Sequence, residues 1–155
     1  MANKTQTQEK EIPKAIQAWG KEYPKKVIPL IESAKNSISI IAYAWKWYSD
    51  DIGCSIMRFN NALIRKAERG VKVRAITESR GIAGKLRTNG IKVKVKPIEK
   101  TIHAKLIIID EEITILGSHN LTKNAFEQNL EISMIYFDKK TNAEYRKLFD
   151  GLWLY

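Results

Sequence analysis

Hydrophobic residues recur along this chain with two different periods, and the two periods predict alternating helices and strands. Between residues 13 and 34 the apolar side chains have helical spacing. We expect an interruption near Tyr23 and Pro24, because the residue before a proline is pushed out of helical geometry. Apolar runs predict strands at residues 37–45, 71–76 and 91–96, and helical spacing predicts helices at residues 56–67 and 81–90.

The second half of the chain begins with an isoleucine-rich hairpin, "TIHAKLIIIDEEITILGSHNLT", at residues 101–122. We expect a two-residue turn at Glu111 and Glu112. A short crossing, a strand at residues 130–137 and a closing helix complete the pattern. This order predicts an α/β fold with a mixed β-sheet flanked by helices on both faces. We assign residues 13–155 to one domain and residues 1–12 to a flexible N-terminal arm.

Composition adds a strong positive charge to this picture. The 155 residues suit a single domain, and 27 Lys and Arg against 17 Asp and Glu give a formal net charge of +10. The electrostatic field of such a positive charge attracts nucleic acids or anionic lipid surfaces. The polar start and the lack of a membrane-length apolar run predict a cytoplasmic protein. The single cysteine, Cys54, is expected to be a small buried residue.

Four different polar residues occur at the outer ends of the two strands of the predicted hairpin. Because side chains alternate in strands, His103 and Lys105 share one face, as do Ser118 and Asn120. The expected turn places Lys105 opposite Ser118 and His103 opposite Asn120, so the four converge. Glu-Glu is not the Asn-Gly that such turns prefer, and a slip of one residue would break the alignment. An imidazole, a cation, an amide and a hydroxyl are the groups that bind a tetrahedral phosphate.

Three further polar residues are placed by the same alternation. Glu131 opens the next strand and is a candidate to hold the other nitrogen of the His103 imidazole, which would fix its tautomer. Asp110 has the opposite parity, so we expect a structural role. His119 also has the wrong parity to join His103, and we expect it on the back face or in a loop.

The stretch "HAKLIIIDEEITILGSHN" contains His-x-Lys, four residues, Asp, six residues and Gly-Ser-x-Asn. This pattern resembles the signature of the phospholipase D superfamily at every fixed position. The resemblance extends from about residue 27 to residue 149. It implies that Glu131 stands where the family places the acid that orients the histidine, and that Asp110 and Gly117 are structural positions of the motif. Thr77 and Glu78 depart from it, since an acid is expected directly after that strand.

The resemblance also implies a mechanism and a partner. Family members generally build one active site from two copies of the motif, and this chain has one copy. A homodimer with its site on the two-fold axis is therefore implied. One His103 would attack phosphorus to give a phosphohistidine, and the other would protonate the leaving oxygen and then activate water. Lys105 and Asn120 would hold the non-bridging oxygens, and neither a metal nor another cofactor is expected.

The substrate class is predicted from charge and from the short length. Short members with a single motif resemble bacterial endonucleases, and the net charge favours DNA or RNA. Trp45 and Trp47 follow the first strand, where they would stack on bases or, more commonly, pack in the core or an interface. Three lysines share one side of the strand before the hairpin, as a basic wall or as a solvated edge that blocks aggregation. These are Lys92, Lys94 and Lys96.

Four alternatives compete with a nuclease. Ser118, His103 and Glu131 could form a serine hydrolase triad, although "LGSHN" is not the turn that exposes such a nucleophile. His103, Asp110 and His119 could bind a metal, although alternation splits them between faces. A phospholipid hydrolase at anionic membranes and a non-catalytic dimer that binds nucleic acid both remain open.

Overall fold

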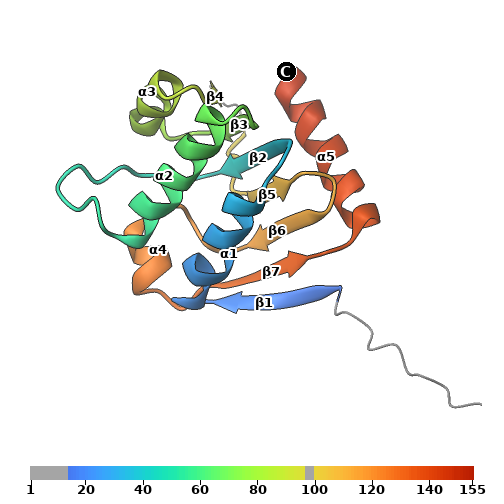
Figure 1. The fold of residues 1–155 in the computed structure, drawn as a ribbon, viewed down its shortest axis with the longest axis horizontal. Coiled ribbons are helices and arrows are strands. Elements are labelled where there is room, and N and C mark those ends of the chain that lie inside the picture. The colour runs from blue at the N-terminus through green and yellow to red at the C-terminus, as the bar shows by residue number, and fades with distance from the viewer. Residues whose placement is uncertain (1–13, 97–99) are drawn as a thin grey trace, which may run out of the picture.

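The computed structural model describes residues 14–96 and 100–155, so the predicted arm at residues 1–12 lies outside the described residues. Within these ranges the chain forms a seven-stranded mixed sheet in the order β1-β7-β6-β5-β2-β3-β4 (Figure 1). β2, β3 and β4 run parallel, and the remaining neighbours are antiparallel. The strands are β1 (Ala15–Trp19), β2 (Ser37–Ala42), β3 (Lys72–Thr77), β4 (Lys92–Val95), β5 (Lys105–Ile109), β6 (Ile113–Gly117) and β7 (Ile132–Tyr136).

Helices cover both faces of this sheet, as predicted. The larger core packs one face against four helices, and Figure 1 shows α1 and α2 crossing over that face. The smaller core packs the other face against α5, whose Phe149 belongs to the same buried cluster as Ile41, Ile76 and Ile108. No helix in the described ranges has the length and apolar character needed to cross a membrane. The helices are α1 (Glu22–Ser33), α2 (Ser55–Glu68), α3 (Arg80–Thr88), α4 (Lys123–Glu127) and α5 (Lys139–Leu154).

The helix predicted across residues 13–34 is wrong in its first part. Residues 15–19 form β1, an edge strand that pairs antiparallel with β7. The chain then turns at Gly20, whose φ of 38° lies in the left-handed region that favours glycine. Pro24 does not interrupt the helix. It is the third residue of α1, where an absent N–H costs nothing because the first turn has no internal acceptor.

The predicted register of the hairpin is also wrong, by one residue. Ile109 pairs with Ile113, so the connection has three residues instead of two. Asp110 begins the connection with a φ of 51°, a conformation that Asp tolerates better than most residues. Its carboxylate accepts hydrogen bonds from the backbone N–H groups of Lys35, Asn36 and Ser37 at 2.7–2.9 Å. These bonds tie the hairpin turn to the start of β2.

Candidate active site

The polar ends of the hairpin lie at the edge of the sheet where the parallel strands β2, β3 and β4 finish. Lys105 opens β5 and pairs with Ala42, the last residue of β2. Tyr43 follows directly, and its ring centroid lies 4.9 Å from that of His103. The carboxyl edge of parallel strands is a common place for ligand sites in α/β sheets.

His103 and Lys105 form the exposed part of this site. The Lys105 ammonium donates to the His103 carbonyl oxygen at 2.8 Å and lies 3.0 Å from the Nδ1 atom of its ring. The same ammonium lies 5.6 Å from the centre of the Tyr43 ring. Burial lowers the pKa of the Lys105 ammonium below its ordinary value, and the Glu131 carboxylate opposes that shift. The imidazole is therefore exposed, and the half-buried ammonium lies beside it.

Ser118 and Glu131 form the second part of the site. The Ser118 hydroxyl donates to the Glu131 carboxylate and accepts the backbone N–H of Ile132 at 3.0 Å. Asn129 donates to the other carboxylate oxygen at 3.1 Å. Among the described residues no hydrogen bond joins Glu131 to His103, so the expected contact with the imidazole is absent within one chain. Glu131 instead acts on Lys105 through its charge.

Gly117 allows this second part to form. It is the last residue of β6 and pairs with Ser133 of β7. A Cβ atom on Gly117 would overlap the Ser133 hydroxyl and the Ile132 carbonyl oxygen. A glycine is therefore required for β6 and β7 to approach closely enough for Ser118 to reach Glu131. This geometry gives Gly117 a structural role in the packing of β6 on β7.

Asn120 lies just beyond β6, and the segment that contains it runs beside the residues that follow β2. Its neighbour Leu121 donates a backbone hydrogen bond to Ala44 at 3.0 Å, which holds this segment against the end of β2. The Oδ1 atom of Asn120 is buried and has no hydrogen-bond partner in the described part of the chain. Buried polar atoms are nearly always paired, so this unpaired acceptor is an exception. The Nδ2 group of Asn120 is the one that can donate to a ligand oxygen.

This geometry can be compared with known proteins. The family described as "Cardiolipin synthase, PLD-like domain" matches residues 27–153. The chain belongs to the phospholipase D superfamily. Within it, the chain is 32% identical to a "Phospholipase D" of Rickettsia prowazekii over 127 residues, which are 78% of this chain and 58% of that protein.

Two further comparisons show how far the likeness to this superfamily extends. A "Mitochondrial cardiolipin hydrolase" of Xenopus laevis is 33% identical over 98 residues, or 59% of this chain and 47% of that protein. The chain thus spans about half of the length of these curated relatives. The structure of Nuc from Salmonella typhimurium, described as a phospholipase D family member, matches with a TM-score of 0.75 and 24% identity. That match covers 90% of this chain and 93% of Nuc, and it shows the same fold.

His119 takes no part in this phospholipase D-like site. Its side chain is 1% exposed and stacks on Tyr23, with ring centroids 4.0 Å apart. One ring nitrogen lies 2.8 Å from the Ser133 hydroxyl, and burial holds the pKa of His119 below its ordinary value. Asp110 lies at the far end of the hairpin, and the described residues contain no cluster of metal-binding side chains. The proposed metal ligands are therefore not brought together.

The two tryptophans predicted to bind nucleic acid have different positions. Trp45 is 2% exposed, and its indole N–H donates to Asn60 Oδ1 at 2.8 Å, so it is a core residue and cannot stack on a base. Trp47 is half-buried and lies under the Lys85 ammonium, which is 5.5 Å from the ring centre. Trp47 alone remains a candidate for stacking.

Lys92 and Lys94 of β4, and Lys96 just after it, do not form a wall at the site. β4 is an edge strand, and alternation directs its lysines to the face that α5 covers. Lys94 donates to the Trp153 carbonyl oxygen, and its ammonium lies 5.2 Å from the Trp153 ring centre. Lys92 is exposed, and only Lys96 follows the strand at the edge that carries His103. The solvated-edge interpretation therefore describes Lys92, and Lys94 belongs to the packing of α5.

Two residues near His103 were not predicted. Tyr43 contacts the His103 ring, and its place directly after a buried strand is a signal that could have identified it. The Glu78 carboxylate accepts the backbone N–H of Ile102 at 2.6 Å, which holds the segment that leads to His103. The departure at Thr77 and Glu78 therefore places an acid within reach of the motif.

Proposed function

We propose that this chain is a metal-independent phosphodiesterase that cleaves DNA or RNA internally through a covalent phosphohistidine. The main support for the proposal is the pairing of an exposed imidazole with a half-buried ammonium, His103 with Lys105, at the carboxyl edge of the sheet. A net charge of +10 supports a polyanionic substrate. The match to Nuc over nearly its whole length supports a short, single-motif member of the superfamily.

The proposed reaction has two displacements at phosphorus. In the first, a His103 ring nitrogen attacks phosphorus, the bond to the leaving oxygen breaks, and that oxygen takes a proton from a second histidine. In the second displacement, the second histidine removes a proton from water. The resulting hydroxide attacks phosphorus, and the phosphohistidine bond to the first His103 breaks. Lys105 neutralises the non-bridging oxygens throughout, and Asn120 binds one of them.

The second histidine must come from a second copy of the chain. The sequence has two histidines, and His119 is buried against Tyr23 and Ser133. A homodimer that places two His103 side chains on one phosphate therefore completes the proposed site. Its interface also offers Glu131 of one copy to His103 of the other, which accounts for the missing contact within one chain.

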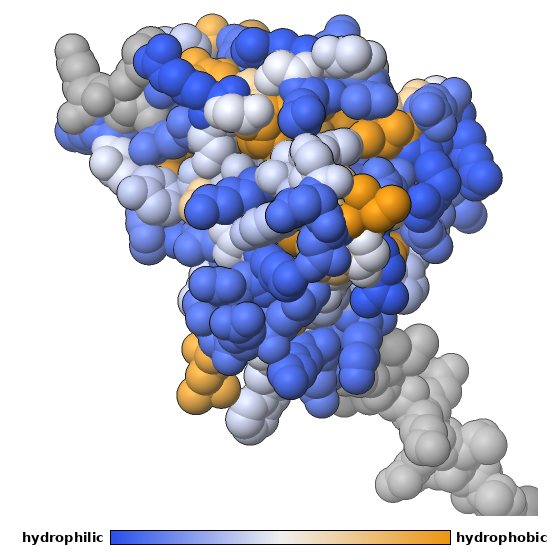
Figure 2. Space-filling view, turned by 90° about the vertical axis from the view of Figure 1, so that its left-hand side faces the viewer, coloured by the Kyte–Doolittle hydropathy of each residue, from blue (hydrophilic) through white to orange (hydrophobic). Residues whose placement is uncertain are grey.

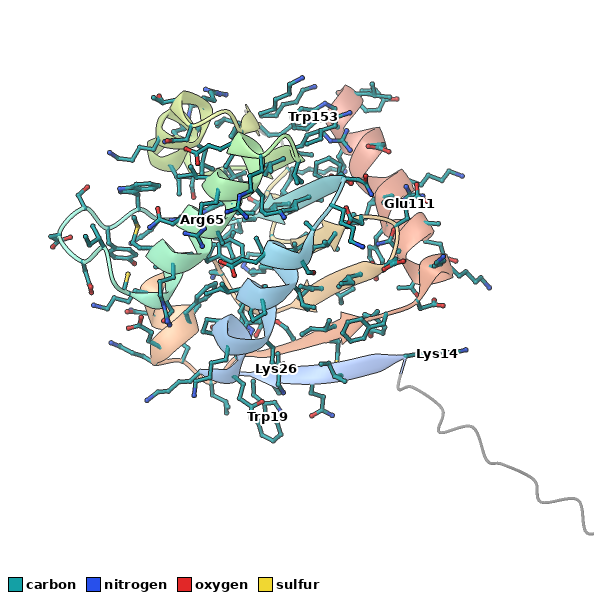
Figure 3. The ribbon with its side chains drawn as sticks, in the orientation of Figure 1. Lys14, Trp19, Lys26, Arg65, Glu111 and Trp153 are labelled. Atoms are coloured by element: carbon teal, nitrogen blue, oxygen red, sulfur yellow. The ribbon has the colours of Figure 1, made fainter. Side chains whose placement is uncertain are left out.

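An exposed apolar patch beside Glu131 suits such an interface. Leu130 and Ile132 flank Glu131 and are 82% and 55% exposed. Trp19 pairs with Ile132 across β1 and β7, is 52% exposed, and points away from the sheet edge in Figure 3. Exposed apolar side chains that cluster next to a site commonly mark an interaction surface. We place the dimer contact at this patch.

A phospholipid hydrolase is the second candidate, and the names of two relatives favour it. "Phospholipase D" and "Mitochondrial cardiolipin hydrolase" both belong to proteins about one-third identical over the matched residues. The same histidine, lysine and asparagine would act on the phosphodiester of a lipid headgroup. The two candidates therefore differ in the surface that binds the rest of the substrate.

One assay tests both candidates. Wild-type protein, His103→Ala and the surface control Lys140→Gln are incubated in excess chelator with single-stranded DNA, duplex DNA, RNA and anionic phospholipid vesicles. We expect wild type and the control to cut a nucleic acid and His103→Ala to cut nothing. Cleavage of lipid alone would establish the second candidate instead, and equal cleavage by His103→Ala would contradict the proposed chemistry in either form.

A further inference from the structure

A groove runs between α1 and α2, on the face of the sheet opposite to α5. Two hollows of about 490 and 390 Å³ share Pro24, Lys25 and Arg58 in their walls, so they adjoin each other along the depression between the two helices. Its outer end lies beside Glu32 and Arg65, and its inner end lies against Phe126 and α4. We call this depression the α1–α2 groove. It is separate from the edge that carries His103.

The charges in the α1–α2 groove are unbalanced. Lys21, Lys25 and Arg58 line it and form no ion pair with any acid among the residues that the structure describes. Its two acids are already engaged. Glu32 pairs with Arg65 at 2.5 Å, and Glu127 accepts the backbone N–H and the hydroxyl of Ser55 at 2.8 and 2.6 Å. Three exposed cations therefore remain for an external anion.

The positions of these groups along the helices suit an extended ligand with repeated charge. Arg58, Asn61 and Arg65 are three and four residues apart, so they follow one face of α2. Arg65 follows Arg58 by seven residues, which is about 10 Å along the helix. Lys21 and Lys25 are four residues apart on the facing side of the groove. Figure 3 shows Arg65 on α2, where the helix passes close to α1.

The surroundings of the groove favour a nucleic acid strand over a membrane. None of the large apolar side chains that are exposed in the described ranges lines it, so nothing in its walls would insert between lipids. The side of the molecule that carries α4 and the start of α2 is largely hydrophilic in Figure 2. A concave, cationic channel with an amide donor matches a sugar-phosphate backbone, which is bound mainly through its phosphates.

We propose that the α1–α2 groove binds the backbone of a nucleic acid strand at a distance from the point of cleavage. The proposal rests on the proposed nuclease function and names a second binding surface for its substrate. α4 closes the inner end of the groove and begins three residues after Asn120, so a strand that leaves the active site and passes α4 enters the groove. A long substrate occupies both places, whereas a short one occupies the active site alone.

The test compares two double variants that remove the same charge. Lys25→Gln with Arg58→Gln removes two groove cations, and Lys140→Gln with Lys147→Gln removes two exposed lysines of α5. Each pair is made in the His103→Ala background for binding and in the active protein for cleavage. Fluorescence anisotropy measures the binding of strands of about 6 and about 40 nucleotides, within and well beyond the usual site sizes for single strands. Thermal unfolding verifies that both pairs fold.

We expect the groove pair to bind the long strand about tenfold more weakly than the α5 pair. The slope of the logarithm of the association constant against the logarithm of the salt concentration should be smaller in magnitude by about 1.4, because two phosphate contacts are lost. Binding and cleavage of the short strand should match the α5 pair. Equal losses in the two pairs, or no loss in the groove pair, would overturn the groove proposal while leaving the nuclease proposal intact. If the groove pair loses affinity for anionic vesicles and not for the long strand, a membrane is the occupant and the proposal is wrong. A wild type that cuts neither strand contradicts the proposed function itself.

Discussion

The two ends of the β5–β6 hairpin carry polar residues that differ in where they find partners. At the turn, Asp110 directs both carboxylate oxygens to backbone N–H groups at the start of β2. At the open end, His103 and Lys105 contact each other and Tyr43, and His103 is exposed to solvent. The turn end is satisfied by the chain itself, whereas the open end keeps its hydrogen-bonding capacity for a ligand.

Under the proposed function, this difference separates residues that hold the fold from residues that would perform the chemistry, although both belong to one sequence motif. A substitution at the turn end should cost stability and spare the activity of the folded molecules. A substitution at the open end should cost activity and spare stability. Gly117 should affect both stability and activity, because it controls the packing of β6 on β7 and the position of Ser118.

The largest expected effect is that of His103→Ala. Loss of the nucleophile should lower the rate constant for phosphodiester cleavage by about a thousandfold or more. His103 is exposed, so the free energy of unfolding should change by less than about 0.5 kcal/mol. Rapid-quench trapping should find a phosphorylated intermediate in wild type and none in the variant. An adduct on Ser118 instead would support a serine hydrolase.

Lys105→Gln should have the next largest effect. Removal of a cation that stabilises the charge of the transition state costs about a hundredfold in kcat. Lys140→Gln removes the same charge from the exposed surface of α5 and serves as the matched control. If both variants lose activity equally, the effect is one of overall charge, and Lys105 has no special place in the site.

Most of the architecture could be predicted from the sequence, because buried runs and helical spacing are local signals. The mixed sheet with helices on both faces is confirmed, and so is the nature of β2, α2, β3 and β7. β1 was missed because Ile16 and Trp19 are three residues apart, which suits a helix as well as a strand. Its extended form depends on pairing with β7, which is more than a hundred residues away in the sequence.

The register of the hairpin could not be predicted for a related reason. A two-residue turn at Glu111 and Glu112 satisfies the local pattern, and Figure 3 shows Glu111 close to α5, where it pairs with Arg146. The three-residue turn depends on bonds from Asp110 to residues 35–37, which are distant in the sequence. The one-residue shift takes Lys105 and His103 out of the predicted alignment with Ser118 and Asn120. His103 precedes β5 and Ser118 follows β6, so both lie beyond the paired residues.

Gly117→Ala should affect both stability and activity. The new methyl group overlaps Ser133 and Ile132, and such overpacking costs about 1–3 kcal/mol of the free energy of unfolding. Separation of β6 from β7 should also displace Ser118 from Glu131 and lower kcat. Gly84→Ala is the control, because its Cβ meets nothing within 4 Å and the helix α3 favours alanine. A Gly117→Ala protein with normal stability would show that this close approach is dispensable.

Asp110→Asn should have the smallest effect and should act on stability alone. Burial acts to raise the pKa of the Asp110 carboxyl, but bonds from the N–H groups of Ser37, Lys35 and Asn36 outweigh it and hold the pKa below the ordinary value of 3.8. A carboxyl whose pKa is lower in the folded state stabilises the fold above its unfolded pKa, and that contribution is lost as pH falls through the folded pKa. The variant should therefore unfold more easily than wild type at pH 7, by about 1 kcal/mol. The free energies of unfolding of the two proteins should converge as the pH falls below 3.8.

Two outcomes would contradict this prediction. A difference in the free energy of unfolding that persists in acid would mean that the turn is held by its shape and not by the charge of Asp110. A loss of kcat at pH 7 in the folded variant would mean that the two ends of the hairpin do not have separate roles.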